Sequence, residues 1–295
     1  MSKPSYVQKS VERMKIYMEL RGLRPNTAYS FAHCARRFLA HVGKPLAAVT
    51  TKDVEGFLLD LARKGRSPRT RNVNLSAVRC LLVATIGDKR RVVTTGIPNA
   101  KVPRRSPEIL SGSEIVRLLD ATEQPKYRAI FMLAYGAGLR VGEITALQVP
   151  DIDSERMLIH VREGKTGPRH VLLSPRVLAA LRTYWRAARP VGPELFPGGR
   201  SQRPGTHLTR ESINRVLAKV ASKAGIKKRV HPHLLRHCFA THMLETGANL
   251  RTVQVLLGHA CIQSTTTYLH LSNAHLRATP SPIDLLGTPG WKILG

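Results

Sequence analysis

Residues 231–259, HPHLLRHCFATHMLETGANLRTVQVLLGH, decide how the carboxy-terminal half of the chain folds. The spacing of their apolar residues predicts two helices, over residues 232–245 and 250–257. His233 and Arg236 stand three residues apart, so both side chains project from one face of the first helix. The opposite face is apolar and is expected in the core; it carries Leu235, Phe239 and Met243.

Further residues with chemical potential lie on either side of this stretch. Arg140 supplies a second guanidinium upstream, and His259 and Tyr268 follow the second helix. Two arginines suit a phosphate because each planar fork donates two parallel hydrogen bonds to its oxygens. A tyrosine hydroxyl can attack phosphorus and form a covalent ester that is later released. Together these side chains indicate the transfer of phosphodiester bonds.

Helical periodicity also extends through the first ninety residues. Thr50 is a predicted N-cap, and Pro68 stands at the first position of a helix, where proline is favoured. Four helices around one small core are expected, over residues 7–21, 25–41, 52–63 and 68–82. In the second half, Ser111 and Glu114 fit a capping box. Additional helices are expected there over residues 126–135, 178–189 and 209–224.

A single hairpin is the β structure that the pattern predicts. Residues 156–161 and 169–173 alternate apolar and polar side chains around Gly164 and Gly167. The expected fold class is therefore mainly α with a small β-hairpin or sheet (α+β). Residues 88–109 contain three prolines and six basic residues. They predict a basic linker that lets two lobes close on a duplex as a C-shaped clamp.

The charge balance points to a nucleic-acid partner. Lys and Arg number 47 against 19 Asp and Glu, a net charge of +28. Such an excess disfavours the compact state, so a polyanion is the expected partner. Basic side chains around the turn between the third and fourth expected helices and in the linker are predicted to contact DNA phosphates: Arg63, Lys64, Arg66, Arg69, Arg71, Arg104 and Arg105.

Other classes of protein are disfavoured by the sequence. No run approaches about 18 apolar residues, and no lipidation signal is present, which argues against a membrane protein. Four cysteines without CxxC spacing suit free thiols in a reducing cytosol, so a cytoplasmic location is expected. No GxxxxGK[ST] loop is present, which argues against ATP use.

The motifs resemble those of the tyrosine recombinases of the integrase family. The layout is similar to bacterial Xer-type and integron or transposon integrases, and the likeness covers roughly residues 5–275. The matching stretches, in family order, are GAGLRVGEITAL, GKTGPRHVLL, HPHLLRHCFATHMLETGANLRTVQVLLGH and STTTYLHL. The resemblance implies a helical, SAM-like core-binding domain that binds DNA over residues 1–90, a basic linker over 91–108, a catalytic integrase domain over 109–278 and a tail over 279–295.

The resemblance also implies an activity. It predicts a site-specific recombinase that cuts and rejoins DNA through a 3′-phosphotyrosyl bond, without a metal, ATP or another cofactor. Tyr268 would be the nucleophile, and Arg140 and Arg236 would bind the scissile phosphate. Lys165, at the tip of the hairpin, would protonate the departing 5′ oxygen. The remaining roles are assigned to His233, as proton acceptor or orienting group near Tyr268, to His259, as hydrogen-bond donor to a non-bridging oxygen, and to Glu143, as a support for Arg140.

Three alternatives compete with this interpretation. His233 and His237 have an i, i+4 spacing that can bind zinc, but the glutamate of HExxH is absent and no further ligands complete a site. Type IB topoisomerases share the tyrosine chemistry without pairing two sites. A non-catalytic DNA-binding protein would share the positive charge.

The resemblance further implies an assembly. Members of the family act as tetramers on two paired duplexes that carry inverted-repeat half-sites, and a partner recombinase is a further alternative. Residues 283–286 of the tail are expected to dock on a catalytic domain, with a disordered tail as the alternative. The target sequence does not follow from the chain, nor does the choice among integration, excision, transposition and dimer resolution.

Overall fold

Helices dominate the structure, as the sequence predicts. The computed structural model describes residues 6–87, 92–103, 108–162, 167–198, 208–258 and 265. The chain divides into two units, Met1–Arg105 and Ser106–Gly295, each with its own hydrophobic core. No helix within the described ranges is long and apolar enough to cross a membrane.

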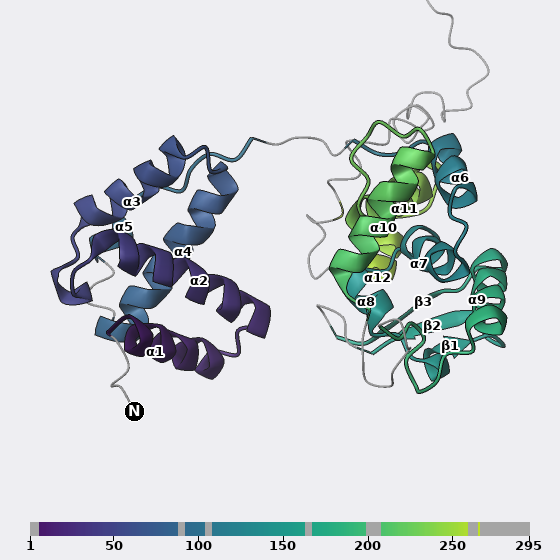
Figure 1. The fold of residues 1–295 in the computed structure, drawn as a ribbon, viewed down its shortest axis with the longest axis horizontal. Coiled ribbons are helices and arrows are strands. Elements are labelled where there is room, and N and C mark those ends of the chain that lie inside the picture. The colour runs from purple at the N-terminus through teal and green to yellow at the C-terminus, as the bar shows by residue number, and fades with distance from the viewer. Residues whose placement is uncertain are drawn as a thin grey trace, which may run out of the picture. The chain divides into compact units, whose positions relative to one another are not determined.

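The amino-terminal unit is built from the four predicted helices and one short additional helix (Figure 1). Thr50 and Asp53 form a capping box, and the Ser67 hydroxyl accepts from the backbone N–H of Thr70. Phe38 and Phe57 meet edge to face in the core, with ring centroids 5.3 Å apart. The helices are α1 (Tyr6–Leu20), α2 (Pro25–Val42), α3 (Thr51–Arg63), α4 (Pro68–Ile86) and α5 (Val92–Thr95), with a 3-10 helix at Leu46–Ala48.

Part of the stretch predicted as a linker packs on the amino-terminal unit. Val93 in α5 and Ile97 are buried in the same core as α1–α4. Ala100 exchanges two hydrogen bonds with the side chain of Asn72 on α4, at 2.8 and 2.9 Å. The prolines and basic residues predicted a linker, but Val93 and Ile97 are buried in the amino-terminal core, and Asn72 and Arg79 of α4 hydrogen-bond to the backbone of Thr94, Ile97 and Ala100.

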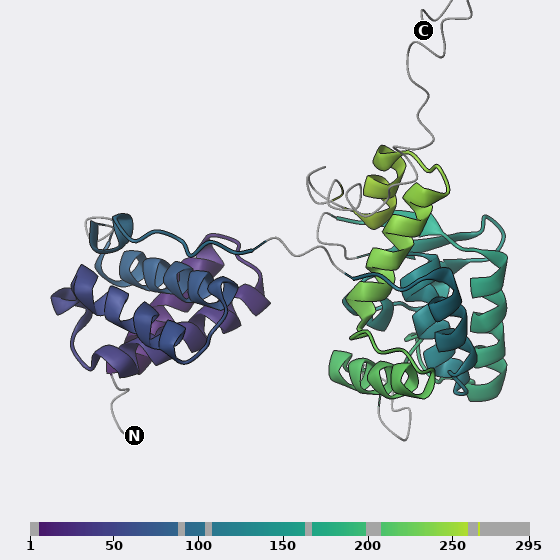
Figure 2. The ribbon, with the colours of Figure 1, turned by 90° about the horizontal axis from the view of Figure 1, so that it is seen from above.

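The carboxy-terminal unit is a helical bundle with one small sheet. Helix α7 is its centre, since it packs against both α9 and α11 (Figure 1). The helix α12 lies beside strand β3 (Figure 2). The helices are α6 (Gly112–Asp120), α7 (Pro125–Gly136), α8 (Val141–Thr145), α9 (Pro175–Ala188), α10 (Arg210–Lys223), α11 (Pro232–Glu245) and α12 (Leu250–Leu257), with a 3-10 helix at Val149–Asp151.

The predicted hairpin is present and gains a third strand. Strands β2 (Leu158–Val161) and β3 (Arg169–Leu172) are antiparallel, with Ile159 opposite Val171. Both of these side chains are buried, so the inward face of the hairpin packs on the hydrophobic core. Strand β1 (Ile152–Asp153) pairs with β2 and was not predicted, because two residues are too few to show an alternation.

Candidate active site

A sharp turn delivers Arg140 to the site. Gly138 has φ +63°, in the left-handed region, and its carbonyl faces α11. Arg140 follows as the N-cap residue of α8. Its backbone N–H donates to Glu143 Oε2 at 2.9 Å, and its Nη1 donates to Glu143 Oε1 at 2.7 Å. The predicted support of Arg140 by Glu143 across one helical turn is therefore present.

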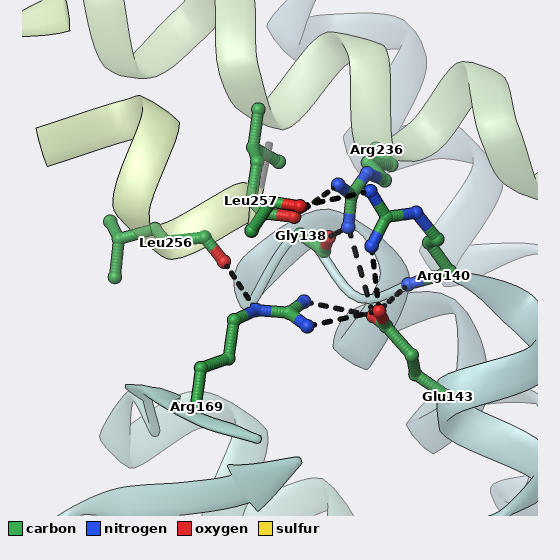
Figure 3. Close-up of polar contacts among 8 residues, drawn as sticks. Gly138, Arg140, Glu143, Arg169, Arg236, Leu256 and Leu257 are labelled. Atoms are coloured by element: carbon green, nitrogen blue, oxygen red, sulfur yellow. Dashed lines mark hydrogen bonds and ion pairs between the residues drawn. The ribbon is translucent and has the colours of Figure 1, made fainter. Parts of the chain in front are cut away.

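Arg236 reaches the same place from α11. Its side chain is almost fully buried, with 1% of the residue exposed. Nη1 donates to the carbonyl of Gly138 at 2.6 Å, and Nη2 donates to the carbonyl of Leu257 at 2.5 Å (Figure 3). Nη1 also lies 3.7 Å from Glu143 Oε2. The turn before α8 and the end of α12 thus hold one guanidinium between them.

Glu143 is the common anion of this cluster. Besides Arg140 and Arg236, it binds Arg169 of β3, whose Nη1 and Nη2 donate to Oε1 and Oε2 at 3.0 and 2.9 Å (Figure 3). Burial raises the pKa of Glu143, but hydrogen bonds from Arg169 and from the Arg140 backbone outweigh it and lower the pKa to about 2. The carboxylate therefore stays charged at neutral pH beside three guanidinium groups.

Two histidines of α11, His233 and His237, have lowered pKa values. Burial lowers the pKa of His233, and the charges of Arg236 and Arg140 lower it further. Burial and then the nearby His233 lower the pKa of His237 to about 4. The rings of His233 and His237 are 5.4 Å apart between centroids. At neutral pH both are unprotonated, so His233 is able to accept a proton.

An open pocket of about 650 Å³ lies beside Arg140 and His233. Its lining is strongly basic and includes Arg140, Arg210, Arg229, His231 and His233. Gly142 also belongs to the lining, and a Cβ atom there would lie 2.5 Å from Arg210 Nη2. The absence of a side chain at Gly142 lets the Arg210 guanidinium lie against the start of α8. The pocket can bind an anion through several guanidinium groups.

Comparison with known proteins connects this geometry to a family. The profile of the phage integrase family matches residues 108–275, which is more than half of the chain. The chain belongs to the phage integrase family. It is a tyrosine-type site-specific recombinase, and a phage integrase N-terminal SAM-like domain matches residues 11–90.

Two relatives illustrate the similarity of the recombinase in sequence. A putative integrase/recombinase of Sinorhizobium fredii is 36% identical over 280 residues, covering 94% of this chain and 89% of the relative. The tyrosine recombinase XerA of Pyrococcus furiosus is 33% identical over 279 residues, covering 94% of each chain.

Two solved structures show similarity in fold. A crystal structure of XerA recombinase matches 96% of this chain and 99% of its own, with 28% identity and a TM-score of 0.52. A lambda integrase dimer bound to a COC′ core site matches 92% of this chain and 79% of its own, with 17% identity and a TM-score of 0.72. The second match shows the fold alone.

Several predicted site residues of the recombinase lie outside the described part of the chain. These are Lys165, His259, Tyr268, Arg104 and Arg105, together with residues 283–286 of the tail. Their neighbours in sequence are described. Strands β2 and β3 precede and follow Lys165 in the sequence, and Gly258, which precedes His259, caps α12 with φ +59°.

The predicted DNA contacts of the amino-terminal unit lie around the end of α3 and the start of α4. Arg63, Lys64, Arg66 and Arg69 are exposed, as a phosphate contact requires. Arg71 is half-buried, and its Nε has no hydrogen-bond partner within the described ranges.

Sequence reasoning missed three basic residues of the site. Arg169 was seen only as a strand residue of the hairpin, although it binds Glu143. Arg210 and Arg229 were not singled out, although they line the pocket. Among the residues that the structure covers, no group of three His, Cys, Asp or Glu side chains is arranged to hold a metal ion.

Gly138 should tolerate no side chain. We expect Gly138→Ala to destabilise the protein by about 2–4 kcal/mol, because left-handed φ is unfavourable for alanine and the new atom overpacks the core. A Cβ atom would lie 2.5 Å from Cδ1 of the buried Phe239. Gly225→Ala is the matched control, since Gly225 has φ +68° and no atom within 4 Å of the added Cβ. Urea-induced unfolding measures both variants; equal losses would contradict the packing argument.

The half-buried His237 should make the recombinase sensitive to acid. Its pKa of about 4 in the folded chain is below the value of about 6.5 in an unfolded chain. Between these pH values the unfolded chain binds more protons at His237 than the folded chain does. The free energy of unfolding is therefore independent of the titration of His237 above pH ~6.5 and falls as the pH drops toward ~4. We expect His237→Gln to reduce the slope of the unfolding free energy against pH in this range, by an amount that corresponds to the uptake of up to about one proton on unfolding. The exposed His170→Gln is the control, and an unchanged slope in His237→Gln would refute the expectation.

Proposed function

We propose that this recombinase breaks DNA by attack of the Tyr268 phenolate oxygen on a backbone phosphorus. A bond forms between that oxygen and phosphorus, and the bond from phosphorus to the 5′ oxygen breaks. The product is a 3′-phosphotyrosyl ester and a free 5′ hydroxyl, and a 5′ hydroxyl from another strand reverses the step. Because the ester conserves the energy of the broken bond, ligation needs no ATP.

The observation that best supports the proposal is the fixed pair of guanidinium groups. Arg140 and Arg236 come from different helices and meet at one buried carboxylate, with further hydrogen bonds to the Gly258 and Gly138 carbonyls. Preorganised cations of this kind stabilise the negative charge that gathers on the non-bridging oxygens in the transition state. Glu143 orients them but neutralises only part of their charge.

Proton transfers complete the reaction. His233, neutral at pH 7, is positioned on the helix that carries Arg236 and would accept the phenol proton as Tyr268 attacks. Lys165 would donate a proton to the departing 5′ oxygen, because an alkoxide is a poor leaving group. His259 would donate a hydrogen bond to a non-bridging oxygen.

The substrate is proposed to be duplex DNA with inverted-repeat half-sites. Residues 1–90 and 109–278 would each bind the duplex. Residues 92–100 pack on the amino-terminal core, so residues 101–108 of the predicted basic linker would follow the DNA backbone. Arg63, Lys64, Arg66, Arg69, Arg71, Arg104 and Arg105 would contact phosphates, as would Arg210 and Arg229 beside the scissile phosphate. A similar structure, XerH, is described as bound to a palindromic substrate in a post-cleavage complex. Four copies on two duplexes are proposed as the active assembly.

Trapping of the covalent intermediate tests the function. A duplex is first selected from a random-sequence library by binding to the full-length protein, and then nicked at successive positions. A nick beside the scissile phosphate lets the short 5′-hydroxyl fragment diffuse away, so the adduct accumulates. We expect a covalent protein–DNA adduct that maps to Tyr268 by mass spectrometry. An adduct on another residue, or none on any duplex that is bound, would overturn the proposal.

A further inference from the structure

Arg169 has the contacts of a residue that orders the site, although the reaction described above assigns it no step. It opens strand β3, and only 9% of its side chain is exposed. Its two Nη atoms bind both oxygens of Glu143, at 2.9 and 3.0 Å. This paired geometry fixes the direction of the carboxylate as well as its charge, which a lysine could not do.

The third nitrogen of Arg169 binds a different segment. Nε donates to the carbonyl of Leu256 at 3.1 Å (Figure 3). The side chain also packs tightly against Gly258, where an added Cβ atom would lie 3.0 Å from Cδ and Nε. One side chain therefore joins the start of β3, the first turn of α8 and the end of α12.

We propose that Arg169 is a positioning residue that couples the hairpin to the phosphate-binding arginines. The inference rests on the proposed function. In the sequence, Lys165 precedes Arg169 by four residues and His259 directly follows Gly258. Arg169 thus ties together the two segments that lead to the proposed proton and hydrogen-bond donors, and it holds them to the carboxylate that orients Arg140.

Electrostatics gives the same residue a second effect. Glu143 lies 2.7 Å from Arg140 and 3.7 Å from Arg236, with Arg169 at 2.9 Å. With Arg169 in place, a large part of the carboxylate charge is balanced by a cation that does not bind the phosphate. If Arg169 is lost, Glu143 is balanced mainly by Arg140 and Arg236, and their attraction for the transition state weakens.

Replacement by lysine tests the proposal, with single-turnover strand cleavage, DNA affinity and thermal unfolding measured on the selected duplex. We expect Arg169→Lys to bind DNA within about twofold of the wild type but to cleave about 10–100-fold more slowly, as for misplacement by about 1 Å. Arg162→Lys is the matched control. Arg162 follows β2 and binds the buried Asp151 at 2.9 Å, away from Glu143. We expect it to cleave within about threefold of the wild type, since Arg162 donates to Gln148, Ala146 and Asp151 and not to Glu143.

A double substitution separates positioning from general stability. Arg169→Met combined with Glu143→Gln removes both partners of the ion pair, while the buried Arg236 keeps its hydrogen bonds to the Gly138 and Leu257 carbonyls. The double variant is therefore expected to fold and to lose less stability than the two single variants together. Because Arg169 and Glu143 act as a unit, the double variant should cleave within about threefold of the slower of the two single variants, Arg169→Met and Glu143→Gln. If neither single variant folds, the double variant should cleave at least about tenfold more slowly than the wild type.

Two results would overturn the role of Arg169. One is wild-type cleavage by Arg169→Lys or by the double variant. The other is a cleavage rate that falls in both Arg169→Lys and Arg162→Lys in the same proportion to the thermal stability that each variant loses. The wild-type chain in the same assay distinguishes failure of the proposed tyrosine chemistry from failure of the proposed role of Arg169. If the wild type forms no adduct, the tyrosine chemistry is contradicted and not the role of Arg169.

Discussion

Tyr268→Phe is expected to abolish strand cleavage while DNA binding remains within about twofold of the wild type. The substitution removes the nucleophilic oxygen and nothing else, and no covalent ester can form without it. Loss of a residue that forms the covalent intermediate lowers rates by about 10⁶-fold in well-studied cases. On the nicked duplex described above, the adduct should fall below detection. Binding measured by titration of the intact duplex should be unchanged, because the lost hydroxyl carries no charge.

Tyr135→Phe is the matched control for this prediction. Tyr135 lies on α7, and its hydroxyl is 3.0 Å from His242 Nδ1. Removing that hydroxyl should cost about 1 kcal/mol of stability and leave cleavage within about threefold of the wild type. Adduct formation by Tyr268→Phe, or its loss in Tyr135→Phe, would show that the nucleophile has been misassigned.

The parts of the fold that depend on local sequence were predictable. Helices α11 and α12 have the bounds that the apolar spacing and the flanking residues indicate, from Pro232 to Glu245 and from Leu250 to Leu257. The hairpin followed from alternation around two glycines. These features are local because helix caps, proline positions and strand alternation act within a few residues.

The parts that depend on tertiary contacts were not predictable. Arg169 and Glu143 are separated by 26 residues, and the tertiary fold brings β3 and α8 close enough for them to bind each other. The sequence suggested a pair between Arg140 and Glu143, but an exposed pair of that spacing contributes little. In the folded chain Glu143 is buried, and its carboxylate lies beside three arginines, Arg140, Arg169 and Arg236. Similarly, Val93 and Ile97 were predicted as linker residues, but both are buried in the core of the amino-terminal unit.

The same contacts give Arg236 a structural role beside the catalytic role proposed for it. Its guanidinium donates to the carbonyls of Gly138 and Leu257, which belong to the turn before Arg140 and to the end of α12. A phosphate would meet a cation that these carbonyls already hold in place. Such preorganisation lowers the cost of orienting the group during the reaction. Any variant of Arg236 must therefore be judged by stability and by rate together.

Arg236→Lys is expected to reduce strand cleavage by about 10³–10⁵-fold, the range found when an arginine that stabilises a phosphoryl transition state is lost. Lysine keeps the charge, but its three donors radiate from one nitrogen and do not reproduce the planar fork whose two Nη atoms reach the separate Gly138 and Leu257 carbonyls. Unsatisfied carbonyls would also cost about 1–3 kcal/mol each, which thermal unfolding will report. Arg117→Lys, an exposed arginine on α6 of the same unit, should change neither property. A rate within about tenfold of the wild type, with clearly lowered stability, would mean that Arg236 supports the fold without acting on the phosphate.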